Sequence, residues 1–168
     1  MNHFRKVFCF VSCIVLLWGG QVFSNPIRVY ADITGDLFHK GHVEFFKKAR
    51  EYGDYLVVGV LADEVVETYK RAPILNLEER VSVIEACKYV DEVIIAPPLR
   101  LTEELIRAYD IDVVVHGDDF NEENYLDQYA VPVQMGIFKL VPYTEGISTT
   151  EIINRIEKRV LVNLSLKE

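Results

Sequence analysis

The stretch DITGDLFHKGH, residues 32–42, joins two segments of different periodicity. The apolar, strand-like run Ile27–Tyr30 precedes it, and the helix-like run Val43–Glu51 follows it. A strand is therefore followed directly by a helix. Because the first amides of a helix have no partner within the helix and its dipole favours negative charge, we expect this junction to bind an anion such as phosphate.

Two histidines flank a glycine in this stretch. Gly41 lets the backbone come close to a ligand, and His39 and His42 add hydrogen-bond donors that can become cationic near neutral pH. Either histidine alone is more often a capping or packing residue. The pair with Gly41 between them favours the phosphate-binding interpretation.

Length and composition favour one domain. With 168 residues, half of them hydrophobic, the chain can bury one full core and is too short for two ordinary domains. Cys87 is the one cysteine after residue 24, so we expect no disulfide framework and interpret Cys87 as a core residue.

The N-terminal residues differ from the rest of the chain. Basic side chains precede the apolar run Val7–Trp18, a pattern typical of a signal peptide. A buried strand or helix is the alternative, and the run is short for a transmembrane span. We expect a leader at 1–24, a domain at 25–160 and a frayed tail at 161–168.

The expected domain is acidic. After residue 24, 16 Lys and Arg side chains stand against 26 Asp and Glu, a net charge of −10. Such a surface repels nucleic acids and anionic membranes. The basic side chains in the motifs are therefore expected to bind a small anion.

Apolar runs and helical patterns alternate along the chain. The expected strands are Ile27–Tyr30, Tyr55–Leu61, Glu92–Ile95, Asp112–His116 and Gly136–Val141. The expected helices are Val43–Tyr52, Asp63–Tyr69, Leu77–Tyr89, Thr102–Tyr109 and Ser148–Val160. This order predicts an α/β fold, a Rossmann-like, doubly wound, parallel five-stranded sheet with helices on both faces.

Ligands of such sheets bind beyond the carboxyl ends of the strands, where the strand order reverses. The first expected strand ends at residues 32–42 and the fourth at His116–Asp119, so these motifs fall where a site is expected. Residues 121–134 lack a clear period and are expected to form a loop with a short helix over the site.

Two motifs carry a family resemblance. The chain has HKGH at residues 39–42 and YTEGISTT at 143–150, and further matches lie at Lys70 and at His116–Asp119. Over Ile27–Ile156 the chain resembles the cytidylyltransferase-type nucleotidyltransferases, whose hallmarks are H-x-G-H and R-T-E-G-I-S-T-T.

The resemblance implies transfer of CMP from CTP to a phosphorylated small alcohol, with release of pyrophosphate, for phospholipid or envelope synthesis. The attacking phosphate oxygen is already ionised at neutral pH, so no general base is required. The site has to align two anions and stabilise the charge that develops. Mg²⁺ is expected with the nucleotide, and a homodimer is expected.

The resemblance also implies roles for individual residues. His39, His42 and Lys70 are the expected catalytic residues. The expected nucleotide-binding and phosphate-binding residues are Thr34, Gly35, Gly41, Arg80, Gly117, Asp118, Asp119, Thr144, Gly146, Ile147, Ser148 and Thr149. Asp36 and Tyr143 are the expected substrate-binding residues, and Asp36 is also a candidate for Mg²⁺ contact.

Several of these residues have simpler interpretations. The Ser148–Glu151 segment has the pattern of a helix capping box, which is compatible with phosphate binding. Arg80 is nearly as well explained by an exposed salt bridge. Lys47 and Lys48 are interpreted as part of a solvated helix face.

The chain departs from the family pattern in three places. Tyr143 stands where many relatives have an arginine, and Gly35 stands where an aromatic residue is usual, which predicts a roomier pocket floor. The only tryptophan, Trp18, lies in the leader, which disfavours an aromatic cage for phosphocholine. Phosphoethanolamine, glycerol 3-phosphate and a phosphonate remain open as acceptors.

Alternative functions follow from these departures: an adenylyltransferase that uses ATP on a sugar phosphate, a cytidylyltransferase for phosphonates, or a catalytically impaired nucleotide-binding scaffold. The leader indicates export or membrane anchoring through the N-terminal segment only. Because CTP and ATP are cytoplasmic or organellar substrates, the expected reaction instead favours a protein located in the cytoplasm or an organelle.

Overall fold

The computed structural model describes residues 25–119 and 126–165, and the predicted leader lies outside them. Its centre is a parallel sheet of five strands in the order β3-β2-β1-β4-β5. The strands are β1 (Arg28–Ile33), β2 (Tyr55–Val60), β3 (Glu92–Ile95), β4 (Val113–Gly117) and β5 (Phe138–Val141). The predicted α/β, doubly wound, five-stranded fold is confirmed.

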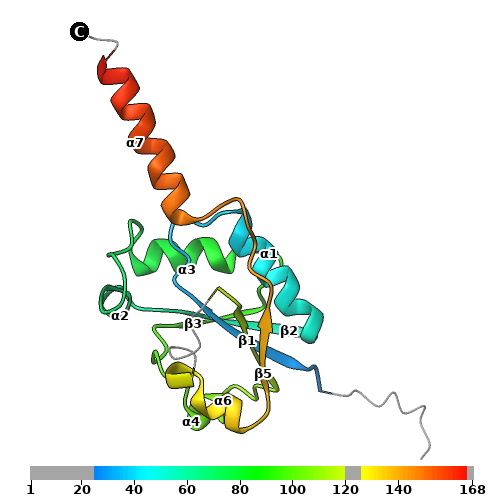
Figure 1. Ribbon diagram of the computed structural model, residues 1–168. Helices are drawn as coiled ribbons and strands as arrows, with labels where there is room; N and C mark the ends of the chain where they lie inside the picture. The colour runs from blue at the N-terminus through cyan, green and yellow to red at the C-terminus, as the bar shows by residue number, and fades with distance from the viewer. Residues whose placement is uncertain (1–24, 120–125, 166–168) are drawn as a thin grey trace, which may run out of the picture.

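Helices alternate with the strands along the chain. They are α1 (Lys40–Ala49), α2 (Asp63–Glu67), α3 (Leu77–Glu85), α4 (Glu103–Ala108), α6 (Ala130–Gln134) and α7 (Thr149–Ser165). The first helix continues into a single 3₁₀ turn, Arg50–Tyr52. α1 and α3 cover one face of the sheet and α4 and α6 the other, while α7 projects away from the sheet (Figure 1). No helix in the described ranges is long and apolar enough to cross a bilayer.

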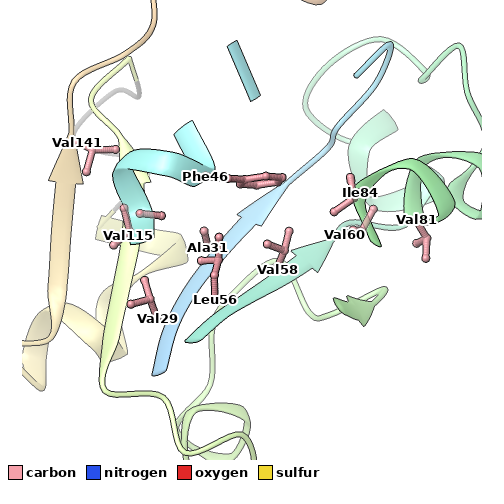
Figure 2. Close-up of a cluster of buried hydrophobic side chains, with 11 residues drawn as sticks. Val29, Ala31, Phe46, Leu56, Val58, Val60, Val81, Ile84, Val115 and Val141 are labelled. Carbon is pink, nitrogen blue, oxygen red and sulfur yellow. The ribbon is translucent and has the colours of Figure 1, made fainter. Parts of the chain in front are cut away.

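Two hydrophobic clusters explain the apolar runs. Val29 and Ala31 of β1 pack beneath Phe46 of α1, as Figure 2 shows, whereas Tyr30 packs on the opposite face with Ile106 of α4. A central parallel strand is buried on both faces, so consecutive side chains are apolar and the run shows no alternation.

The strand order places the site. From β1 the chain proceeds to β2 and β3 on one side, then returns to β4 on the other side of β1. The order reverses between β1 and β4, so their carboxyl ends lie side by side. Residues 32–42 and 116–119 include these two ends and line one cavity at the reversal, as predicted.

Some element ends differ from the prediction. β1 continues to Ile33 because Asp32 and Ile33 still pair with β2, although the polar Asp32 interrupts the apolar run. α3 ends at Glu85, where a turn brings Cys87 against the core. α7 continues to Ser165, five residues past the predicted end.

Candidate active site

A cavity of about 640 Å³ lies at the carboxyl ends of β1 and β4. Thirteen predicted site residues line it: Thr34, Gly35, Asp36, His39, Gly41, His42, Lys70, Gly117, Asp119, Tyr143, Thr144, Ser148 and Thr149. Four predicted residues lie outside the lining: Arg80, Asp118, Gly146 and Ile147. The topology therefore gathers segments that are far apart in the sequence around one cavity.

The two histidines form the N-terminal cap of α1. The Gly41 N–H donates to His39 Nδ1 at 3.1 Å, and the His39 N–H donates to His42 Nδ1 at 3.3 Å. The capping interpretation is therefore correct, and it is compatible with a role in the cavity. Since both Nδ1 atoms accept hydrogen bonds, each neutral ring carries its proton on Nε2.

The histidine pair is largely neutral. Burial lowers the pKa of His39. Burial is the main cause that lowers the pKa of His42 to about 3. The charges of His39 and Lys70 lower this pKa as well, and the charge of Asp36 opposes them. At neutral pH these rings act as hydrogen-bond donors and not as fixed positive charges.

Gly41 is required by close packing. A Cβ atom at this position would lie 2.9 Å from His39 Cε1 and 3.5 Å from Ile147 Cγ2. Any side chain here would displace the His39 ring that caps the helix. Gly41 thus keeps the His39 ring in place and brings Ile147, which lies outside the cavity lining, against the start of α1.

Asp36 connects three segments of the site. Its Oδ1 accepts hydrogen bonds from the Ile74 and Leu75 N–H groups, both at 3.0 Å. Its main-chain oxygen accepts the Thr149 hydroxyl at 2.8 Å. Asp36 was predicted to contact substrate or Mg²⁺. It lines the cavity, but one of its two carboxylate oxygens accepts hydrogen bonds from the turn that follows Lys70.

Gly35 occupies a left-handed turn, with φ at +71°. A Cβ there would meet Ile84 Cδ1 of α3 at 2.6 Å. The space beside Gly35 is filled by the core, so the prediction of a roomier pocket floor at this position is wrong.

Two predictions were made for Arg80: that it reaches the nucleotide, and alternatively that it forms an exposed salt bridge. Both are wrong. The Arg80 side chain is 0% exposed. Its guanidinium donates to the main-chain oxygens of Thr34, Leu61 and Leu75 and to the Asp63 carboxylate. Arg80 therefore joins the ends of β1 and β2 to the start of α3 beneath the cavity.

The segment before α7 is held from two sides. Lys48 Nζ donates to the Pro142 oxygen at 2.6 Å, so the interpretation of Lys48 as part of a solvated face is wrong. Asp118 Oδ1 accepts the Tyr143 N–H at 2.7 Å. Asp118 was predicted to bind the nucleotide; its carboxylate instead positions the Tyr143 backbone.

The start of α7 lines the cavity. Ser148 Oγ accepts the Glu151 N–H at 3.1 Å, which confirms the capping interpretation of this segment. Gly146 makes the preceding turn with φ at +85°. Ser148 and Thr149 line the cavity, so the first amides of α7 lie beside it.

A group of acidic and aromatic side chains that was not predicted also lines the cavity. The Tyr129 hydroxyl donates to Asp32 Oδ1 at 2.5 Å, and the His116 ring lies 5.2 Å from the Tyr129 ring. Burial raises the pKa of Asp32, while His116 and the Tyr129 hydrogen bond oppose that rise. A carboxylate at the end of a buried strand was a usable signal for Asp32; the aperiodic segment around Tyr129 offered none.

No group of three or more His, Cys, Asp or Glu side chains suited to a metal ion occurs in residues 25–119 and 126–165.

Comparisons with known proteins identify relatives. Residues 34–155 match a family described as cytidylyltransferase-like. The chain is 48% identical to the ethanolamine-phosphate cytidylyltransferase of Dictyostelium discoideum, in a match that covers 79% of this chain. It is 39% identical to choline-phosphate cytidylyltransferase A of Homo sapiens, in a match that covers 82% of this chain. The match covers 38% of either relative. Among solved structures, a lipopolysaccharide core biosynthesis protein from Thermoplasma volcanium GSS1 superposes with a TM-score of 0.59 and 26% identity, over 73% of this chain and all of that one.

Proposed function

Because the chain belongs to the cytidylyltransferase-like family, we propose that it transfers CMP from CTP to phosphoethanolamine. An oxygen of the acceptor phosphate attacks the α-phosphorus of CTP. The bond from this phosphorus to the bridging oxygen of the outer two phosphates breaks, and pyrophosphate leaves. The product is CDP-ethanolamine, a precursor for phospholipid synthesis.

Two chemically different groups of side chains in the cavity lining carry this proposal. His39, His42, Lys70 and the start of α7 offer donors and positive charge for phosphates. The Asp32 carboxylate, 8% exposed, with the Tyr129 hydroxyl on it, also lines the cavity. An acceptor that carries both a phosphate and an ammonium group matches both.

The charge on Asp32 discriminates among acceptors. Burial of this carboxylate is unfavourable unless a cation or donors compensate for it. The ammonium group of phosphoethanolamine supplies a positive charge and three donors, and its presence would lower the raised pKa of Asp32 again. Glycerol 3-phosphate supplies no cation, so it is the weaker candidate.

The histidines stabilise charge and transfer no proton. Their Nε2–H groups are the donors left after capping, and they would bind oxygens of the α-phosphate as negative charge shifts onto it. Donors held in place by the cap require no reorganisation during the reaction. Lys70 contributes positive charge from the turn after α2, although burial lowers its pKa.

Mg²⁺ is proposed to enter with the triphosphate. It keeps several waters and prefers substrate phosphates to a cage of protein ligands, which suits a cavity whose described side chains form no metal cluster. When bound, it neutralises phosphate charge. Asp119, a predicted nucleotide-binding residue, also lines the cavity.

A homodimer and membrane contact through residues 1–24 also remain proposals. Sedimentation of the full chain, with and without anionic vesicles, tests both. A monomeric boundary would contradict the dimer, and absence of cosedimentation would contradict membrane contact.

Pyrophosphate release tests the proposed function. The 168-residue chain is assayed with CTP or ATP against phosphoethanolamine, phosphocholine, glycerol 3-phosphate and aminoethylphosphonate. We expect CTP with phosphoethanolamine to exceed CTP with phosphocholine or glycerol 3-phosphate by about tenfold or more in kcat/KM, the effect of one charge-assisted hydrogen bond. Preference for ATP would indicate an adenylyltransferase, and preference for the phosphonate would indicate the phosphonate enzyme. CTP binding without pyrophosphate release would indicate a scaffold.

A further inference from the structure

Two fixed positive charges line the cavity among the described residues: Lys70 and Arg71, adjacent in the turn after α2. His39 and His42 do not add to them, since burial lowers the pKa of both. Three carboxylates, Asp32, Asp36 and Asp119, also line the cavity. A triphosphate that enters this cavity therefore meets more carboxylates than fixed cations, and each cation matters.

Arg71 is held loosely. Its Nη2 atom lies 3.6 Å from Asp36 Oδ2, an ion pair that is too long for a hydrogen bond. The Arg71 side chain is 44% exposed. Asp36 Oδ2 is buried and has no hydrogen-bond partner within the described residues. Asp36 therefore attracts the Arg71 guanidinium without accepting a hydrogen bond from it.

The backbone on either side of Arg71 is fixed. The Lys70 N–H donates to the Val66 oxygen at 3.1 Å at the end of α2. Beyond Arg71, the Ile74 and Leu75 N–H groups donate to Asp36 Oδ1. Asp36 thus holds the turn with one oxygen and attracts the guanidinium with the other.

The contacts of Asp36 also show which part of the cavity lies beside Arg71. The main-chain oxygen of Asp36 accepts the Thr149 hydroxyl, so Asp36 lies against the first residue of α7. Arg71 therefore lies on the side of the cavity that Ser148 and Thr149 line at the start of α7.

We propose that Arg71 binds the outer two phosphates of CTP and, after transfer, the leaving pyrophosphate. The guanidinium exchanges its long contact with Asp36 for charge-assisted hydrogen bonds to phosphate oxygens, for which its planar fork is suited. This inference rests on the proposed function, because it assigns one residue of that site to the leaving group.

The comparison of CTP with CMP tests this role by direct binding. Isothermal titration of the full chain measures CTP, CMP and pyrophosphate against the wild type, Arg71→Ala and Arg71→Lys. We expect Arg71→Ala to weaken CTP and pyrophosphate by about 10- to 100-fold, as for a lost hydrogen bond to a charged group. CMP lacks the outer phosphates, so its affinity should be unchanged, and Arg71→Lys should fall between wild type and Ala.

Arg107→Ala is the matched control. Arg107 pairs only with Glu103 on the exposed face of α4 among the described residues, and all three affinities should remain at wild-type values. Equal weakening of CMP and CTP by Arg71→Ala would reduce Arg71 to a structural residue and overturn the proposal. Unchanged CTP and pyrophosphate affinities would overturn it as well. The assay needs no turnover, so a chain that releases no pyrophosphate with any acceptor would refute the proposed function and still test Arg71.

Discussion

The imidazole rings of His39 and His42 stack with their centroids 3.9 Å apart, and the Nδ1 atom of each accepts a backbone N–H. The same two contacts cap α1 and leave both Nε2 protons for a ligand. Helix capping and phosphate binding therefore depend on opposite edges of the same rings, and the two roles can be separated by substitution.

Substitution of His39 by Asn should separate capping from catalysis. The Asn oxygen can still accept the Gly41 N–H, because Asn is a favoured capping residue, but the Nε2 donor is lost. We expect kcat to fall by about 10²- to 10³-fold, the usual cost of one donor to developing charge. Thermal unfolding should remain close to that of the wild type. Unchanged kcat would exclude a role for the His39 donor.

Stability below neutral pH should depend on His42. Its pKa is about 3 in the folded protein against 6.5 in the unfolded chain, so between these values only the unfolded chain binds the proton. The free energy of unfolding should therefore decrease as the pH falls from 6.5 towards 3, by about 1.4 kcal/mol per pH unit from this group. Urea unfolding of wild type and His42→Asn across this range should show a shallower slope in the variant. Parallel slopes would contradict the low pKa.

Asp32→Asn should act on the acceptor alone. The variant keeps an oxygen for the Tyr129 hydroxyl but loses the negative charge that would bind an ammonium group. We expect KM for phosphoethanolamine to rise by about 10- to 100-fold with KM for CTP unchanged. Glycerol 3-phosphate, which has no ammonium group, serves as the control substrate. A rise in KM for CTP alone would place the nucleotide beside Asp32.

Asp36 should prove to be a positioning residue. Asp36→Ala removes the acceptor of the Ile74 and Leu75 N–H groups, which should lower the free energy of unfolding by about 2 to 3 kcal/mol and reduce kcat by loosening the Lys70 turn. Asp36→Asn retains an acceptor oxygen and should restore most of both. Failure of Asn to restore kcat would indicate that the charge of Asp36, and not its acceptor, is required.

Arg80→Ala should destabilise the fold. Its loss would leave several buried main-chain oxygens and the Asp63 carboxylate without their donor, at a cost of about 3 to 5 kcal/mol in unfolding free energy. Arg155→Ala on the exposed face of α7 loses only an i,i+4 ion pair and should change stability by less than about 0.5 kcal/mol. Similar melting temperatures for the two variants would contradict the buried role of Arg80.

The predicted order of strands and helices is confirmed because the central strands are buried on both faces and α1 and α3 each turn an apolar face to the core. These patterns extend over a few residues and need no knowledge of the rest of the chain. Element ends were less predictable: Asp32 interrupts the apolar run of β1, although its backbone continues the ladder with β2.

Charged residues were the main source of wrong site predictions. The chain around Arg80 resembles an exposed helix with a phosphate-binding arginine, yet its guanidinium is buried beneath the cavity. Lys48, next to a second lysine, was interpreted as solvated and holds the Pro142 oxygen. A long side chain reaches acceptors on other segments, and local sequence does not record where those segments lie.

The sequence by itself determined the strand, the tight turn and the capped helix of residues 32–42, since the contacts of His39, Gly41 and His42 span at most three positions. Only the tertiary structure decided that Asp32 meets Tyr129, 97 positions away, and that Asp36 meets Thr149, 113 positions away. The reason is the strand order: placing β1 between β2 and β4 brings the carboxyl ends of distant strands to one edge, where their following segments enclose a cavity.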